Sequence, residues 1–102
     1  MTEQFDTYRI YYQSTPRYYW QSRVQLYNDS GYVGRIIFIK EGNPIPENRL
    51  VGGKPELNFP TSCFEEIMGI LRYEKPLYIT LNEANGIGTL STSDEPVGEE
   101  ED

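Results

Sequence analysis

The chain has 102 residues, of which 37% are hydrophobic and 14% aromatic, with a net charge of −7 and one cysteine. This length suits a single domain and leaves no room for a catalytic domain beside a regulatory one. There is no run of about 18 apolar residues and no signal-peptide pattern at the start, which argues against membrane spanning and secretion. Because Cys63 cannot form an internal disulfide, we expect a cytoplasmic protein.

The first half of the chain predicts three strands. Residues 6–13 are rich in aromatic and β-branched side chains and stop before Pro16, and residues 18–27 alternate in polarity with the period of two typical of a strand. A turn over residues 28–31 then leads into a strand at 32–40. Its nearly unbroken apolar run indicates a central strand that is covered on both faces.

The second half predicts a helix and a hairpin. Prolines and glycines make residues 41–55 a long loop with one short edge strand at 49–51, and residues 56–59 extend briefly after it. A helix over about 62–73 follows, with a Ser62–Glu65 capping box and an apolar face of Phe64, Ile67, Met68 and Leu71. Residues 77–82 and 87–92 form the hairpin, joined by Asn85-Gly86.

These elements predict one α+β domain over residues 1–93, an antiparallel sheet of order β-β-β-(β)-α-β-β with the helix packed on it. Residues 94–102 hold six acids and little apolar surface, so we expect an acidic mobile tail. The tail either solubilises the chain or competes with nucleic acid for a basic surface. Residues 1–54 carry seven Lys/Arg against five Asp/Glu, so the acidity belongs to the second half.

The sequence holds few residues of the kinds that carry out catalysis. The chain has no histidine, which removes the commonest general base and the commonest metal ligand. One cysteine cannot build a structural zinc site, and Glu65 and Glu66, adjacent in the predicted helix, point about 100° apart. We therefore predict no enzyme, no cofactor and no metal site. A reactive thiolate at Cys63 is the enzymatic alternative to a small structural residue there.

The candidate site is one face of the predicted strand at 18–27. Its polar residues are Arg17, Tyr19, Gln21, Arg23, Gln25 and Tyr27, with Arg9 and Arg35 extending the face from the neighbouring strands. Interleaved guanidinium and aromatic groups suit stacked bases and phosphates. The same pattern also fits an ordinary solvated face whose tyrosines pair across strands. The other side of the strand, Tyr18, Trp20, Val24 and Leu26, is predicted to face the interior.

The C-terminal third carries three segments that suggest a family. They are Leu-Arg-Tyr-Glu-Lys-Pro-Leu-Tyr at 71–78, Gly-Ile-Gly-Thr at 86–89 and Ser-Asp-Glu-Pro-Val-Gly-Glu-Glu at 93–100. In these segments the chain resembles a family of short uncharacterised cyanobacterial proteins, over residues 5–98. That family is similar in fold to the single-stranded-DNA-binding transcriptional regulators, the positive coactivator domain and the Whirly proteins. The resemblance implies a four-stranded antiparallel sheet followed by a helix, and subunits that pair as homodimers.

Two functions are compatible with these observations. The first is a homodimeric binding domain for single-stranded nucleic acid, of the transcription-regulator type, which uses Arg9, Arg17, Tyr19, Arg23, Tyr27 and Arg35. The second is a protein–protein adaptor that presents the same Tyr/Arg-rich sheet face in a cyanobacterial regulatory or photosynthetic complex. No membrane partner is expected in either case.

Overall fold

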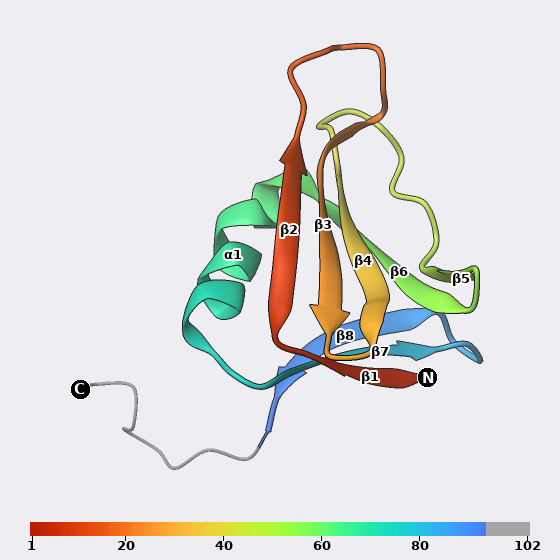
Figure 1. Ribbon diagram of the computed structural model, residues 1–102. Coiled ribbons are helices and arrows are strands. Elements are labelled where there is room, and N and C mark those ends of the chain that lie inside the picture. The colour runs from red at the N-terminus through yellow and green to blue at the C-terminus, as the bar shows by residue number, and fades with distance from the viewer. Residues whose placement is uncertain (94–102) are drawn as a thin grey trace.

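A computed structural model describes residues 1–93, and within them eight strands and one helix form an α+β fold (Figure 1). The strands are β1 (Thr2–Phe5), β2 (Thr7–Tyr12), β3 (Trp20–Asn28), β4 (Gly31–Ile39), β5 (Arg49–Val51), β6 (Lys54–Pro60), β7 (Leu77–Asn82) and β8 (Ile87–Thr92). They form a five-stranded sheet of order β2-β3-β4-β6-β5 and a three-stranded sheet of order β1-β7-β8. Neighbouring strands are antiparallel except β4 and β6, which are parallel.

The helix lies close to its predicted position. A 3₁₀ turn, η1 (Thr61–Cys63), leads into α1 (Phe64–Tyr73), and Ile67, Met68 and Leu71 on its apolar face are buried. The predicted capping box is wrong, because Cys63 occupies the N-cap and no side chain caps the helix. Ser62, which the capping box would need as its N-cap residue, lies within the 3₁₀ turn. The helix ends where the chain becomes extended at Glu74, two residues before Pro76.

Local turn chemistry fixes the hairpins. In the β3–β4 turn, Asn28 Oδ1 accepts a hydrogen bond from the Ser30 N–H at 2.8 Å, and Gly31 supplies the positive φ that follows. Between β5 and β6, Gly52 and Gly53 both have positive φ, which a two-residue hairpin turn of type I′ requires. These turns set which side chains of β3, β4 and β6 share a face.

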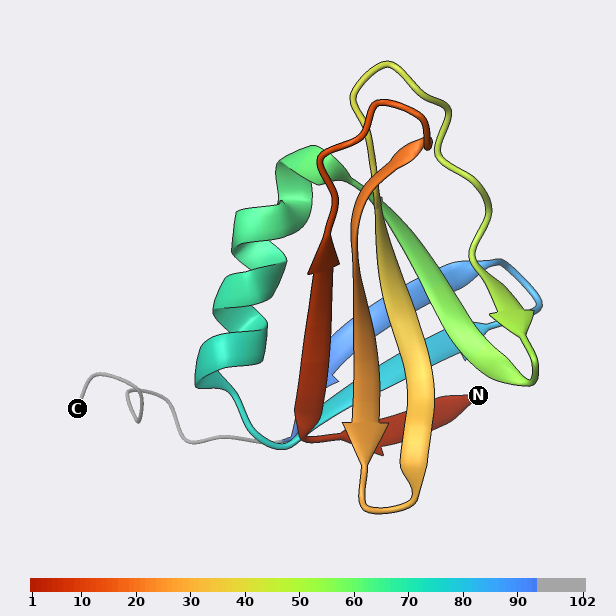
Figure 2. The ribbon, with the colours of Figure 1, turned by 45° about the horizontal axis from the view of Figure 1, so that its top comes forward.

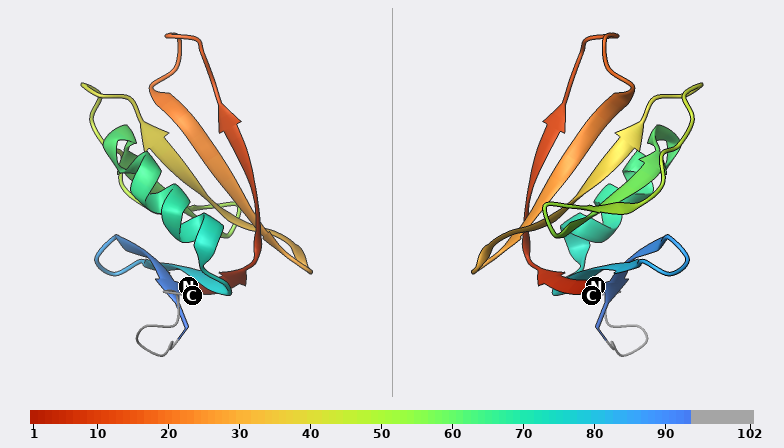
Figure 3. Two further views of the ribbon diagram at one scale, coloured as in Figure 1. Left: turned by 90° about the vertical axis from the view of Figure 1, so that its left-hand side faces the viewer. Right: turned by 90° about the vertical axis from the view of Figure 1, so that its right-hand side faces the viewer.

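One hydrophobic core joins the two sheets and the helix. From the five-stranded sheet it takes Val24, Leu26, Ile36, Phe38 and Leu57; from the three-stranded sheet, Phe5, Leu77, Ile79 and Leu81; and from α1, Ile67, Met68 and Leu71. Figures 2 and 3 show α1 and the three-stranded sheet on the same side of the larger sheet. We call this side of the five-stranded sheet the inner face and the opposite side the outer face.

β4 confirms the prediction of a central strand that is buried on both sides. It lies between β3 and β6, with Ile36 and Phe38 in the core of the inner face. Ile37 and Ile39 alternate with them and are buried on the outer face. The outer face is therefore partly apolar at its centre, and any polar site must lie around these two isoleucines.

Three expectations about the sheet are corrected. The strands form two sheets rather than one, because β1 pairs with β7 and draws the β7–β8 hairpin into a separate layer. β1 itself was not expected, since Thr2–Phe5 is largely polar. The brief extension at 56–59 is part of the seven-residue strand β6, which pairs in parallel with β4.

Two further expectations concern the acidic tail and membrane crossing. Residues 94–102, predicted to be an acidic mobile tail, lie outside the described residues. Within residues 1–93, no helix has the length and apolar character needed to cross a bilayer.

Candidate binding surface on the outer face

Strand register places polar residues of the outer face in two parallel rows. One row crosses all five strands and consists of Arg9, Gln25, Arg35, Glu56 and Arg49. The next row consists of Tyr11, Arg23, Ile37 and Asn58. Residues directly opposite one another on paired strands point to the same side of a sheet. The outer face thus gathers four arginines around one carboxylate, Glu56.

The half of the outer face over β4, β6 and β5 is neutralised internally. Glu56 is buried, with its side chain only 4% exposed, and it accepts a hydrogen bond from Arg35 Nε at 2.7 Å. Its other oxygen binds Arg49 Nε at 3.0 Å. A buried carboxylate needs such partners, since an isolated charge in the interior is strongly destabilising. Arg35 is therefore held in an internal ion pair, and its role in ligand binding stays a prediction.

The half over β2 and β3 holds its cations against rings instead. The Arg23 guanidinium carbon lies 5.2 Å from the Tyr11 ring centroid and 5.0 Å from that of Trp20. Arg23 Nε is buried and has no hydrogen-bond partner among the described residues. Two aromatic faces stabilise the cation by about 0.5–1 kcal/mol each at partly exposed sites. Arg23 is thus positioned without a carboxylate to cancel its charge.

Trp20 and Tyr18 do not point into the interior, which corrects the predicted face assignment. A β-bulge between Trp20 and Ser22 shifts the register of β3 against β4, so that Trp20 lies opposite Ile39 on the outer face. Tyr18 stacks on Trp20 with centroids 5.9 Å apart and is exposed to solvent. Val24 and Leu26 are buried in the core as predicted. Ser22 is buried on the interior side of β3, where the alternation had predicted aromatic side chains.

Arg9 and Tyr27 extend the aromatic side of the face. The Arg9 guanidinium carbon lies 5.7 Å from the Tyr27 centroid, and a side-chain hydrogen bond with Tyr11 raises the pKa of Arg9. Tyr27 donates its hydroxyl to Gln25 Oε1 at 2.8 Å and packs edge-on against Tyr32. We define the β2–β3 cluster as the five residues Arg9, Tyr11, Trp20, Arg23 and Tyr27.

Besides Arg35, two more predicted site residues lie outside this cluster. Arg17 is exposed in the loop between β2 and β3, where its N–H donates to Thr15 Oγ1 at 3.2 Å. Tyr19 also precedes β3, and its carbonyl accepts a hydrogen bond from the Lys40 N–H at 2.9 Å. Tyr19 borders a small groove of about 370 Å³ together with residues 43–46. The strand begins at Trp20, so the alternation of residues 18–27 does not carry Arg17 and Tyr19 onto the sheet.

The structure therefore brings together Arg9, Arg23 and Tyr27 of the predicted residues. Sequence reasoning missed Tyr11, Trp20 and Glu56. Tyr11 follows Arg9 by two positions on the same strand, so the period-two alternation of residues 6–13 was a signal that could have found it. Trp20 and Glu56 had no such signal, because a bulge and a parallel pairing set their positions.

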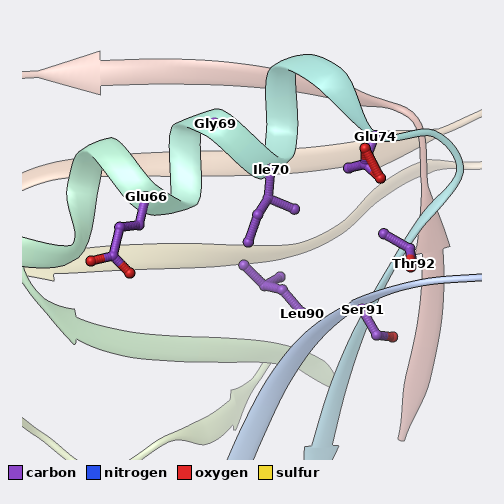
Figure 4. A pocket seen from close by; sticks show the side chains of 7 residues that line it. All are labelled: Glu66, Gly69, Ile70, Glu74, Leu90, Ser91 and Thr92. Atoms are coloured by element: carbon purple, nitrogen blue, oxygen red, sulfur yellow. The ribbon is translucent and has the colours of Figure 1, made fainter. Parts of the chain in front are cut away.

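A groove on the other side of the molecule has the wrong charge for a polyanion. It lies between α1 and β8 and has a volume of about 730 Å³. Figure 4 shows Ile70 and Leu90 facing each other across it, with the side chains of Glu66 and Glu74 along the helix. The Glu66 carboxylate beside an apolar floor repels phosphates. The outer face is the better candidate for an anionic partner.

Metal binding and cysteine chemistry find little support in the described part of the chain. Within residues 1–93 no three acidic, cysteine or histidine side chains gather in a way that could hold a metal ion. Cys63 is partly buried at the N-cap of α1 and packs against the core. This packing agrees with the structural alternative that the sequence offered for Cys63.

Comparison of the chain with protein-family models, with curated proteins and with solved structures finds no match.

Proposed function

We propose that this protein is a non-enzymatic binding module whose β2–β3 cluster binds single-stranded nucleic acid. The observation that carries the proposal is the placement of Arg23 between the Tyr11 and Trp20 rings on the outer face. Neither Arg23 nor Arg9 is in a salt bridge within the described residues. Both cations therefore keep their charge for an external anion.

The chemistry of the cluster fits bases and phosphates together. Exposed π faces stack with any base, contributing about 1–3 kcal/mol per base, and adjacent guanidinium groups bind the backbone. No general base or nucleophile is needed, which agrees with the absence of histidine from the sequence. We extend the proposal to the fold: a sheet followed by a helix that packs on one face leaves the other face free, as the resemblance to single-stranded-DNA-binding transcriptional regulators implies.

Salt dependence of binding tests the proposal directly. Fluorescence anisotropy with a labelled oligothymidine is measured at low salt and at four times that salt concentration. If two or three phosphates are neutralised, the affinity falls roughly 7- to 18-fold across that range. No binding at the lower salt contradicts the proposal.

A pair of matched variants locates the binding site. Tyr11→Ala removes one stacking surface from the β2–β3 cluster and lowers the affinity roughly tenfold. Tyr73→Ala changes a tyrosine that is 81% exposed at the end of α1, away from the outer face, and leaves the affinity unchanged. Equal losses in both variants contradict the assignment of binding to this cluster.

A second function has its own observation in favour. The apolar groove beside Tyr19 is formed by Asn43, Pro44, Ile45 and Pro46, and exposed Tyr18 lies next to it in the chain. Aromatic side chains around a small apolar groove are typical of protein–protein contacts. Under this adaptor proposal, Tyr19→Ala abolishes capture of a protein partner while Arg9→Gln has little effect. The nucleic-acid proposal predicts the opposite order.

A further inference from the structure

The edge of the five-stranded sheet at β2 has few of the features that protect exposed strands. β2 pairs with β3 on one side and with no strand of the described chain on the other. Seen from its own side, β2 stands clear of α1 (Figure 3, left). Ile10 is 39% exposed and Tyr12 63% exposed. Natural edge strands usually carry charged side chains, proline or a bulge, and over its six residues β2 has one charged side chain, Arg9, and neither proline nor a bulge.

Hydrogen-bond parity shows which backbone groups this edge presents. The Gln13 N–H donates to the Gln21 carbonyl at 3.2 Å, and the register from Thr7 to Tyr12 is continuous with that pair. In an antiparallel ladder the bonding residues alternate, so odd-numbered residues of β2 bond with β3. The N–H and C=O groups of Tyr8, Ile10 and Tyr12 therefore point away from the sheet.

We infer that two copies of this chain associate by antiparallel pairing of β2 with β2, with Ile10 on the two-fold axis. This register places Ile10 opposite its own copy and Tyr8 opposite Tyr12 of the second copy. Because these are the residues with outward backbone groups, each pair forms hydrogen bonds along the edge. On the outer face, Arg9 lies opposite Tyr11 of the second copy, which repeats the arginine–tyrosine contacts that Arg9 and Arg23 make within one copy.

Neighbouring registers fit less well. Sliding the pairing by two residues one way places Arg9 directly opposite Arg9 of the second copy, and like charges in that position are destabilising. Sliding it the other way removes Tyr8 from the strand pairing and leaves the Arg9–Tyr11 contact unmade. A slip by one residue turns the inner side chains of one copy toward the outer face of the other. The Ile10-centred register alone satisfies both the backbone and the side chains.

A second copy fits this edge because the segment is self-complementary. The pairing covers the exposed parts of Ile10 and Tyr12 with the same residues of the partner, as an isologous contact requires. Tyr12 already contacts the Phe64 ring at 5.6 Å, so the new contact continues an existing aromatic layer on the inner face. The two outer faces join into one, with a β2–β3 cluster on each side of the axis. The association stands on its own and requires no nucleic acid.

Mass measurement on the full chain tests the association. Light scattering after size-exclusion chromatography is expected to give the mass of two 11.9 kDa chains for the unmodified protein. Ile10→Lys sets two ammonium groups against each other on the axis, and the mass falls to that of one chain. Ile87→Lys is the matched control, because Ile87 is an exposed isoleucine on β8, an edge strand of the other sheet, and this variant keeps the dimer mass.

Oxidative cross-linking tests the register in a Cys63→Ser background. Ile10→Cys places two thiols on a pair whose Cα atoms are about 5.5 Å apart, within the range of a disulfide. Tyr12→Cys is on the same face and is more exposed, yet its copies lie four residues apart along the strand, about 13 Å. We expect a covalent dimer from Ile10→Cys and none from Tyr12→Cys.

Three results overturn the inference. One is a single-chain mass for the unmodified protein, and another is a dimer that survives Ile10→Lys while circular dichroism shows the fold intact. The third is cross-linking of Tyr12→Cys as efficient as that of Ile10→Cys. Because Ile10 is exposed in the single chain, its replacement is not expected to lower the stability of the fold, so loss of the dimer is separable from unfolding.

Discussion

The two halves of the outer face hold arginines in opposite ways. Over β4, β6 and β5, Arg35 and Arg49 both bind the buried carboxylate of Glu56. Over β2 and β3, Arg23 lies between two aromatic rings, and Arg9 lies over a third. In the first half a carboxylate neutralises the arginine charges, whereas in the second half the arginine charges remain available to a ligand.

This difference teaches that the count of arginines on a face does not measure its affinity for anions. A carboxylate partner cancels a cation's field at short range, while an aromatic ring supports the cation and leaves its net charge in place. The half with ring contacts is also the half at the open β2 edge. The proposed binding and the proposed association therefore fall on the same part of the sheet.

The largest expected effect comes from breaking the ion-paired half. Glu56→Gln leaves Arg35 and Arg49 without a carboxylate, and urea unfolding should show a loss of about 2–3 kcal/mol, less than for a fully buried pair because Arg49 is exposed. Glu3→Gln breaks the more exposed pair with Lys54 and costs less than about 1 kcal/mol. Under the proposed function, the freed arginines are also expected to strengthen oligonucleotide binding. Equal stabilities for the two variants contradict the role given to Glu56.

A smaller effect comes from changing the cation in the other half. Arg23→Lys keeps the charge but loses the contacts of the guanidinium group with the Tyr11 and Trp20 rings, at a cost of about 0.5–1 kcal/mol. Trp20 is the only tryptophan, so its emission reports on the change. Arg72→Lys, at the exposed end of α1, should leave both stability and emission unchanged. An unaltered emission in Arg23→Lys contradicts the contact between the guanidinium group and the Trp20 ring.

The smallest effect is expected at Tyr32, where the two halves meet. Burial raises the pKa of Tyr32 above its ordinary value of 10.0, so the folded state favours the protonated phenol. Its contribution to stability is complete below pH 10.0 and is lost as the pH rises through the raised folded value. An absorbance titration should show a late-ionising tyrosine that disappears in Tyr32→Phe. A late step that persists in this variant contradicts the assignment.

The sequence predicted the elements that local signals specify. The i, i+3, i+4, i+7 spacing predicted the helix face, and Asn28, Gly31, Asn85 and Gly86 marked the turns of the β3–β4 and β7–β8 hairpins. The short edge strand β5 lies at the predicted position between its proline and glycine neighbours. These patterns need only a few neighbouring residues to be read.

Pairing between strands far apart in the sequence and one β-bulge account for the features that the sequence did not predict. β1 forms because it pairs with β7, far along the chain, and no pattern within Thr2–Phe5 indicates that pairing. The Arg35–Glu56 ion pair depends on the parallel alignment of β4 and β6. The β-bulge after Trp20 reversed the predicted side of two aromatic residues. Arg9, Arg23 and Tyr27 of the β2–β3 cluster were thus predicted from the alternation, whereas the outward position of Trp20 was not.

Chemical-shift mapping with a short oligothymidine tests the central claim most directly. In a ¹⁵N-labelled sample at low salt, the account predicts that the shifts cluster on β2 and β3, around Tyr11, Trp20 and Arg23. Residues of β5 and of the groove between α1 and β8 should stay in place. Shifts centred on that groove or on β5, or none at all, would contradict the assignment of nucleic-acid binding to the β2–β3 cluster.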